Sequence, residues 1–141
     1  MGQILKVKIV LDTNVILSAL GWLGTPYKVL EEVFCGDVQN FTSPVLIQEL
    51  KRKLTSPKLL FPLSTRSELV DVFLAESTLV HPKIVVDVLP NNDPDNRILE
   101  CALEARADCT VTGDKPLQTL HPWGRIQILS PAKFLQSSLI G

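Results

Sequence analysis

The sequence lacks several features that define whole classes of protein. None of its hydrophobic runs approaches the roughly 20 residues that a membrane-spanning helix needs. Its first residues lack the apolar core and cleavage site of a signal peptide. Its 3 cysteines are an odd number and form no Cys-x-x-Cys pair, so neither a disulfide framework nor a thiolate zinc site is indicated. We therefore expect a cytoplasmic protein with no membrane association.

Neither sign of charge dominates the chain. It has 14 Lys and Arg residues against 15 Asp and Glu residues, which gives a formal net charge of −1. Composition alone therefore does not indicate a nucleic-acid partner, although a local acidic cluster whose charge a metal ion offsets is compatible with one. The 141 residues, 45% of them hydrophobic, fit a single domain over residues 1–141 with one real core.

Short apolar runs alternate with helical patterns along the chain. The order β-α-α-β-α-α-β-α-β-α-β-α predicts an α/β fold with three layers, in which helices cover both faces of a mostly parallel sheet of about five strands. Strands are expected at 7–11, 38–42, 83–88, 108–112 and 125–129, and helices at 15–20, 26–34, 44–54, 64–79, 93–107 and from 131 onward. No regular structure is predicted for 55–63.

Three aspartates lie at one edge of this predicted sheet. Asp12 follows the first strand directly, Asp114 follows the fourth, and Asp95 lies in the first turn of a helix near the same edge. Ligands of open parallel sheets gather outside the carboxyl ends of the strands. Each aspartate could instead cap a helix or complement its dipole. Their common location favours a shared site.

Glu49 is a fourth candidate for that site. Leu46, Leu50 and Leu54 mark the buried stripe of its predicted helix, and Glu49 lies at the margin of the stripe. The alternative is an ordinary ion pair with Lys53 one turn away. Two carboxylates about 5 Å apart repel by roughly 3 kcal/mol at an effective dielectric near 20, and a bound cation removes that cost. Ligation by oxygen alone suits Mg²⁺ or Mn²⁺, which can activate water for phosphodiester hydrolysis.

Four short motifs carry these acids. Asp12-Thr13-Asn14 follows a hydrophobic strand, and Glu49 lies on a capped helix. Asp95 stands in Asp93-Pro94-Asp95-Asn96-Arg97, and Thr112-Gly113-Asp114 follows another strand. Together they resemble the PIN-domain nucleases over nearly the whole chain. The resemblance is nearest to the VapC-like toxins of prokaryotic toxin-antitoxin pairs.

The resemblance implies a Mg²⁺- or Mn²⁺-dependent endoribonuclease that cuts single-stranded RNA, forms a homodimer and is silenced by a cognate antitoxin protein. By carry-over, the catalytic and metal-binding acids are Asp12, Glu49, Asp95 and Asp114. Asn14 and Thr112 are supporting residues that orient the carboxylates. Asp93 competes with Asp95 for the third position, but the proline after Asp93 favours Asp93 as a helix cap. Family members often carry another acid where Asn96 stands.

Basic and aromatic residues near the motifs are candidates for RNA contacts. Arg97 and Lys115 adjoin the predicted acid cluster and could bind phosphate. The run Lys51-Arg52-Lys53 is interpreted as a solvated helix face. Trp22 and Tyr27 could stack on bases, or belong to the core or to a dimer interface. The leucine-rich segment, with Leu59, Leu60, Phe61, Leu63 and Leu69, could be core or dimer interface.

Two other functions were weighed. A phospho-accepting receiver domain also has a parallel sheet, an acidic pocket and a lysine, here Lys115. However, it needs two adjacent acids after its first strand and an aspartate at the end of its third, and this sequence has neither. A PIN-like module that binds RNA or protein without catalysis would have lost one or more of the acids, whereas all four positions are filled.

Overall fold

The computed structural model describes residues 6–21, 24–56 and 62–140. Its elements follow one another in the predicted order. They are β1 (Val7–Leu11), α1 (Thr13–Gly21), α2 (Thr25–Phe34), β2 (Val38–Thr42), α3 (Pro44–Lys53), α4 (Leu63–Ala75), β3 (Ser77–Leu79), α5 (Asn96–Ala105), β4 (Cys109–Val111), α6 (Lys115–Gln118), β5 (Gln127–Leu129) and α7 (Pro131–Gln136). Helices α2, α3, α6 and α7 each begin with proline in the first turn, where its missing N–H costs nothing.

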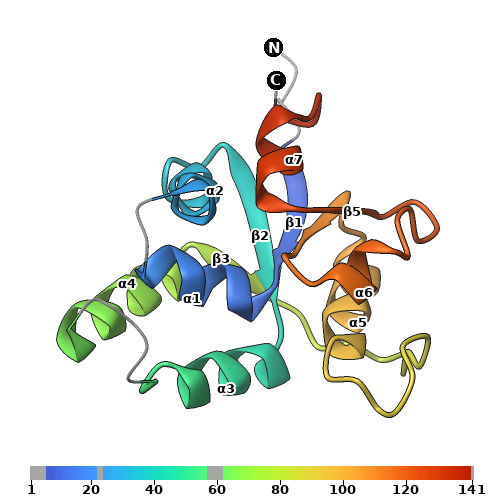
Figure 1. The fold of residues 1–141 in the computed structure, drawn as a ribbon, viewed down its shortest axis with the longest axis horizontal. Coiled ribbons are helices and arrows are strands. Elements are labelled where there is room, and N and C mark those ends of the chain that lie inside the picture. The colour runs from blue at the N-terminus through green and yellow to red at the C-terminus, as the bar shows by residue number, and fades with distance from the viewer. Residues whose placement is uncertain (1–5, 22–23, 57–61, 141) are drawn as a thin grey trace.

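The five strands form one parallel sheet in the order β3-β2-β1-β4-β5 (Figure 1). The chain builds outward from β1 through β2 to β3, then crosses back to place β4 on the other side of β1. The direction of winding therefore reverses between β1 and β4. In open α/β sheets, the crevice at such a reversal is the usual ligand site.

Helices cover both faces of the sheet, which confirms the predicted three-layer α/β/α fold. Ile9 and Leu11 of β1 belong to a core shared with α1, α2, α4 and α7, whereas Val10 belongs to a second core shared with α5 and α6. Figure 1 shows α2 on one side of the sheet and α5 and α6 on the other. A strand buried on both faces needs consecutive apolar residues, and the run in β1 provides them.

The third strand was predicted in the wrong place. The structure has β3 at Ser77–Leu79, directly after α4, and 83–88 forms no strand. Ser77 fixes this pairing, because its Oγ accepts a hydrogen bond from Asn40 Nδ2 of β2 at 2.9 Å and donates one to Phe73 O at 2.7 Å. The segment 83–88 runs along α5 instead, and Ile84 and Val85 are 61% and 81% exposed. Its β-branched residues suggested a strand, but its backbone bonds to side chains.

Some residues with predicted roles lie outside the described ranges. They are Trp22, Leu59, Leu60 and Phe61, so their predicted roles in base stacking, the core or a dimer interface stay predictions. Tyr27 and Leu69 are partly buried and pack against the core. Within the described ranges, no helix is both long and apolar enough to cross a membrane.

Candidate active site

The register of β1 against β4 places two predicted site residues next to each other. Leu11 pairs with Val111, so the residues that follow, Asp12 and Thr112, leave the sheet side by side. Asp12 N donates to Val111 O at 3.0 Å, and Thr112 Oγ1 donates to Asp12 Oδ2 at 2.7 Å. Asn14 N donates to Asp12 Oδ1 at 3.0 Å. Asp12 is therefore held at both carboxylate oxygens and is only 1% exposed.

The environment of Asp12 opposes its ionisation. Burial raises the pKa of the carboxyl, and the negative charge of Glu49 raises it further. The hydrogen bonds from Asn14 and Thr112, together with the positive charge of Lys53, act in the opposite direction without cancelling the rise. A buried carboxylate of this kind gains from any cation that approaches it.

Asp95 and Asp114 meet from different elements. Asp114 caps α6 through Oδ2, which accepts from Leu117 N at 3.0 Å, and its own N donates to Thr112 Oγ1 at 3.0 Å. The Asp114 side chain also shares a hydrogen bond with Asp95. Burial raises the pKa of Asp95 to about 7, with further contributions from the negative charge of Asp12 and from the hydrogen bond and charge of Asp114. Asp95 therefore keeps its proton to a higher pH than an ordinary aspartate does.

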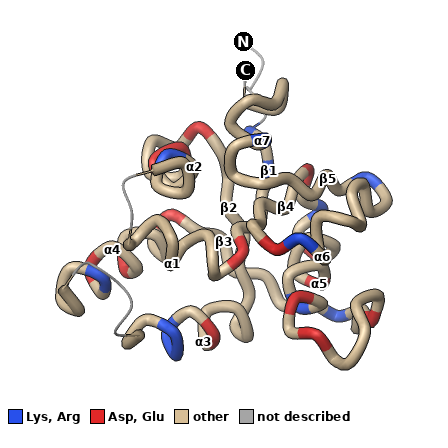
Figure 2. Tube along the Cα trace, viewed as in Figure 1, with Lys and Arg blue, Asp and Glu red and all other residues tan. Residues whose placement is uncertain are grey.

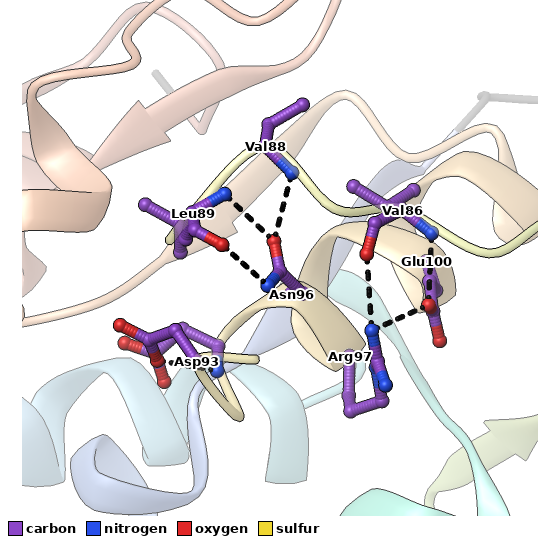
Figure 3. Close-up of polar contacts among 8 residues, drawn as sticks. Val86, Val88, Leu89, Asp93, Asn96, Arg97 and Glu100 are labelled. Atoms are coloured by element: carbon purple, nitrogen blue, oxygen red, sulfur yellow. Dashed lines mark hydrogen bonds and ion pairs between the residues drawn. The ribbon is translucent and has the colours of Figure 1, made fainter. Parts of the chain in front are cut away.

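Asp93 does not cap α5 as predicted. The helix begins later, at Asn96, and Asp95 occupies the N-cap position without a side-chain cap hydrogen bond. Asp93 Oδ1 instead accepts from Asp95 N at 2.9 Å, within the turn that precedes the helix (Figure 3). Asp95 lies close enough to Asp12 and Asp114 for both charges to raise its pKa. The charge of Asp93 raises the pKa of Asp95 least.

Asn96 has a structural role. It is fully buried, and its Oδ1 accepts from Val88 N at 3.1 Å and from Leu89 N at 2.9 Å, while its Nδ2 donates to Leu89 O at 3.0 Å (Figure 3). The amide thereby joins the segment before the turn to the start of α5. Asn96 provides both a donor and an acceptor here, which a carboxylate would not.

Glu49 reaches the same edge from α3. Its charge acts on Asp12, so the two carboxylates are close enough to repel. Lys53, one turn further along α3, forms an ion pair with Glu49 Oε1 at 2.9 Å and donates to Asn14 Oδ1 at 3.2 Å. Figure 2 shows acidic positions on α3, at the start of α1, before α5 and at the start of α6. All four predicted acids thus lie at the carboxyl edge of the sheet.

The two predicted phosphate-binding residues differ in their surroundings. Arg97 Nη2 donates to Val86 O at 3.0 Å and pairs with Glu100 Oε2 at 2.9 Å, so its guanidinium faces the segment along α5 (Figure 3). The structure does not bring Arg97 to the acids. Lys115 is exposed at the first position of α6, directly after Asp114.

The sequence does not place Lys53 or Asn40 in the site. Lys53 is interpreted from the sequence as part of a solvated face or as the ion-pair partner of Glu49; the structure confirms the ion pair and adds a hydrogen bond to Asn14. Asn40 is not among the predicted site residues. Asn40 is 1% exposed, and its Oδ1 accepts from Leu11 N at 3.1 Å, which fixes the end of β1 just before Asp12. A polar residue within a buried strand was the available signal, because such residues need specific hydrogen-bond partners.

The donor set fits a hard divalent cation. It consists of four carboxylates supported by the Asn14 side chain and the Thr112 hydroxyl, all of which offer oxygen. As placed, no three Asp, Glu, His or Cys side chains among the described residues are arranged to hold one metal ion. In the structure, Lys53 contacts Glu49 and Asn14, and Asp95 bonds to Asp114.

A cavity adjoins Asp114 and Asn14. It has a volume of about 360 Å³ and lies between α1, the start of α2 and the loop before α6, where Asn14, Ser18, Pro26 and Asp114 line it. A larger hollow of about 490 Å³ contains none of the predicted site residues and lies at the amino ends of β4 and β5, beside Trp123. Of the two, the smaller cavity is the one that predicted site residues line.

Comparison with known proteins agrees with this geometry. A family model described as PIN domain matches residues 8–116, a span that contains all four acids. An uncharacterized protein of Methanocaldococcus jannaschii is 35% identical over 121 residues, which cover 83% of this chain and 77% of that protein. A chain in the crystal structure of VapBC2 from Rickettsia felis, bound to a DNA fragment from its promoter, superimposes with a TM-score of 0.60 at 17% identity. That match covers 86% of this chain and 97% of the other chain and shows a shared fold. Both the family match and the fold support one conclusion: the chain belongs to the PIN-domain family of nucleases.

Proposed function

We propose that this protein is a divalent-metal-dependent endoribonuclease that hydrolyses phosphodiester bonds of single-stranded RNA. The observation that carries the proposal is the convergence of Asp12, Asp95 and Asp114 at the β1–β4 crevice, with Glu49 facing Asp12. Helix capping accounts for the position of Asp114 in part. It does not account for the placement of four acids, each from a different part of the chain, close enough together to repel one another. Such repulsion costs stability unless the cluster serves to bind a cation.

Of the four acids, Asp12 is the one that the chain's own hydrogen bonds hold in place. Asp12 is held by hydrogen bonds from Asn14 and Thr112, so its oxygens cannot turn away from the crevice. When bound, Mg²⁺ or Mn²⁺ supplies Lewis-acid polarisation of the phosphodiester and lowers the pKa of water. Hydrolysis joins the water oxygen to phosphorus, breaks the bond to the leaving oxygen and transfers one proton to that oxygen. The Thr112 hydroxyl connects the residues that follow β1 and β4, because it donates to Asp12 Oδ2 and accepts from the backbone N of Asp114.

The substrate is expected to approach along the cavity beside Asn14 and Asp114. Lys115 is exposed next to Asp114 and is the better-placed residue for a phosphate contact. Arg97 is withdrawn from this role, because its guanidinium is bound to Val86 and Glu100. A chain with a net charge of −1 gains little from long-range attraction to RNA, so local contacts of this kind matter more.

Cleavage assays with matched variants test the proposal. Purified protein is incubated with single-stranded RNA, duplex RNA and single-stranded DNA in Mg²⁺, Mn²⁺ or EDTA, beside Asp12→Asn and Asp71→Asn. Asp71 is an exposed acid of α4 and controls for the loss of one charge. We expect metal-dependent cutting of single-stranded RNA by the wild type and by Asp71→Asn, and a loss of about 100-fold in Asp12→Asn. Equal cleavage by both, or none by either, would refute the assignment and favour a non-catalytic binding module.

The biological role proposed is that of a VapC-like toxin with a cognate antitoxin, acting as a homodimer. The support is the fold shared with a chain of the VapBC2 structure from Rickettsia felis, together with the resemblance of the four acidic motifs to those of VapC-like toxins. Induced expression should then stop growth in an Asp12-dependent manner, and co-expression of a small neighbouring open reading frame should restore growth. Growth that is unaffected by the wild-type protein would argue against the toxin role while leaving the nuclease assay intact.

A further inference from the structure

Lys53 lies within the acid cluster. Its Nζ is 2.9 Å from Glu49 Oε1 on the same helix and 3.2 Å from Asn14 Oδ1, which lies 39 residues away in the sequence. Asn14 lies in the first turn of α1, two residues after Asp12, and Asp12 experiences the charge of Lys53. One ammonium group therefore touches two of the oxygen donors that the proposed metal site would use and acts on a third.

This contact differs from an ordinary surface ion pair. The side chains of Lys53 and Glu49 are only 29% and 22% exposed, and the additional bond to Asn14 fixes the lysine against α1. Exposed pairs one turn apart contribute little, because both side chains remain mobile in water. Lys51, two residues earlier, is exposed on the same helix and lines a separate apolar hollow with Pro44 and Leu79. Lys53 therefore contacts the acid cluster, whereas Lys51 lies on another part of the surface of α3.

We propose that Lys53 is a built-in counter-cation of the acid cluster, which a divalent metal ion must displace from Glu49 and Asn14 in order to bind. This inference rests on the proposed metal-dependent function and adds a device that regulates it. The lysine reduces repulsion among the carboxylates when no metal ion is bound. It also competes with cations for the same oxygens. A nuclease equipped in this way loads only at metal concentrations high enough to displace its own lysine.

Substitution of Lys53 should therefore tighten metal binding. We expect Lys53→Met to bind Mn²⁺ about 10-fold more tightly than the wild type, the change expected when one unit charge several ångströms from a divalent ion is removed in a water-like dielectric. Lys53→Arg keeps the charge and should stay near the wild-type affinity. Lys51→Met removes the same charge from the exposed part of α3 and should change the affinity by less than about 2-fold.

Direct binding measurements separate this role from catalysis. Mn²⁺ affinity is measured by calorimetry and by the electron paramagnetic resonance signal of unbound Mn²⁺, at pH 8, where protons compete less for the carboxylates. Melting temperatures in EDTA and in excess Mn²⁺ provide a second readout. Lys53→Met should melt lower than the wild type in EDTA and gain more from Mn²⁺. Lys53→Gln repeats the test in case the methionine variant fails to fold.

The outcomes distinguish this inference from the proposed function. If the wild type binds Mn²⁺ and Lys53→Met binds it equally or more weakly, Lys53 is not a competing cation, but the metal site stands. If neither the wild type nor the two Lys53 variants bind Mn²⁺, both the metal site and the role of Lys53 are refuted. Binding by Lys53→Met alone would support the inference most strongly.

Discussion

Replacement of Asp95 by asparagine should stabilise the protein when no divalent metal ion is present. Burial and the charge of Asp12 raise the pKa of Asp95 from 3.8 to about 7. The folded state therefore binds a proton that the unfolded chain releases between about pH 4 and pH 7. Stability from this group is complete below pH 4 and is lost as the pH rises to about 7. Asparagine keeps a hydrogen-bond donor for Asp114 and carries no charge to repel Asp12.

The size of the effect follows from the pKa. A rise of about three units corresponds to roughly 4 kcal/mol if the group is shielded from water. Asp95 is only half-buried, so screening by solvent reduces the figure to about 2 kcal/mol. For a domain of this length, about 2 kcal/mol corresponds to a rise of roughly 6 °C in melting temperature. Asp95→Asn should therefore exceed the wild type by that amount at pH 8 and approach it at pH 4.

Urea unfolding in EDTA across pH 4 to 8 measures this difference. Asp71→Asn is the matched control, since Asp71 is exposed on α4 and should leave the pH profile unchanged. Addition of Mg²⁺ should then stabilise the wild type more than Asp95→Asn, because the variant has lost a ligand. Parallel pH profiles for the wild type and Asp95→Asn would refute the claim that Asp95 is held in a repulsive cluster.

Two further substitutions test the supports of the site. Thr112→Val keeps the shape of the side chain but removes the bond to Asp12 Oδ2 and the acceptor for Asp114 N, so we expect a loss of about 1–3 kcal/mol in urea unfolding together with loss of cleavage. An unfolding curve identical to the wild type would contradict the bridging role of Thr112. Asn96→Ala should cost about 2–4 kcal/mol, because the buried N–H of Leu89 loses its acceptor, and should accelerate hydrogen exchange at Val88 and Leu89. Unchanged exchange at those two amides would show that Asn96 does not hold the segment.

The order of elements and the location of the acidic edge could be predicted because both depend on local patterns. Within Val7–Leu11, the consecutive residues from Ile9 to Leu11 are apolar and buried, which identifies a central strand. The polar residues that follow mark the carboxyl end of that strand. Parallel strands end at the same edge of the sheet, so the sequence predicts that Asp12 and Asp114 lie close together. The register that places Asp12 beside Thr112 depends on the pairing of Leu11 with Val111, and sequence patterns do not specify it.

The misplaced strand has a clear physical cause. The segment 83–88 is rich in β-branched residues, and such residues fit an extended backbone whether or not a second strand is available to pair with it. Its backbone is bonded to side chains of α5, with Val86 N donating to Glu100 and Val86 O accepting from Arg97. The strand that does pair, Ser77–Leu79, has only three residues, and the preceding helical pattern continues into it. The β propensity of 83–88 thus indicated an extended backbone, but it did not indicate which segment pairs with β2.

The two basic residues Arg97 and Lys53 show the same distinction within the site. Arg97 is next to an acidic motif in the sequence, yet its position on α5 turns the guanidinium toward Val86 and Glu100. Lys53 belongs to a run of three basic residues that reads as solvated, yet one turn of helix aligns it with Glu49, and tertiary packing brings it to Asn14. Proximity along the chain is thus a poor guide to which cation neutralises a cluster. Helical phase relative to a known acid is the better guide, because side chains one turn apart share a face. The Glu49–Lys53 spacing and the prediction that Glu49 faces the other acids are therefore compatible, and together they indicate Lys53 as a residue of the site.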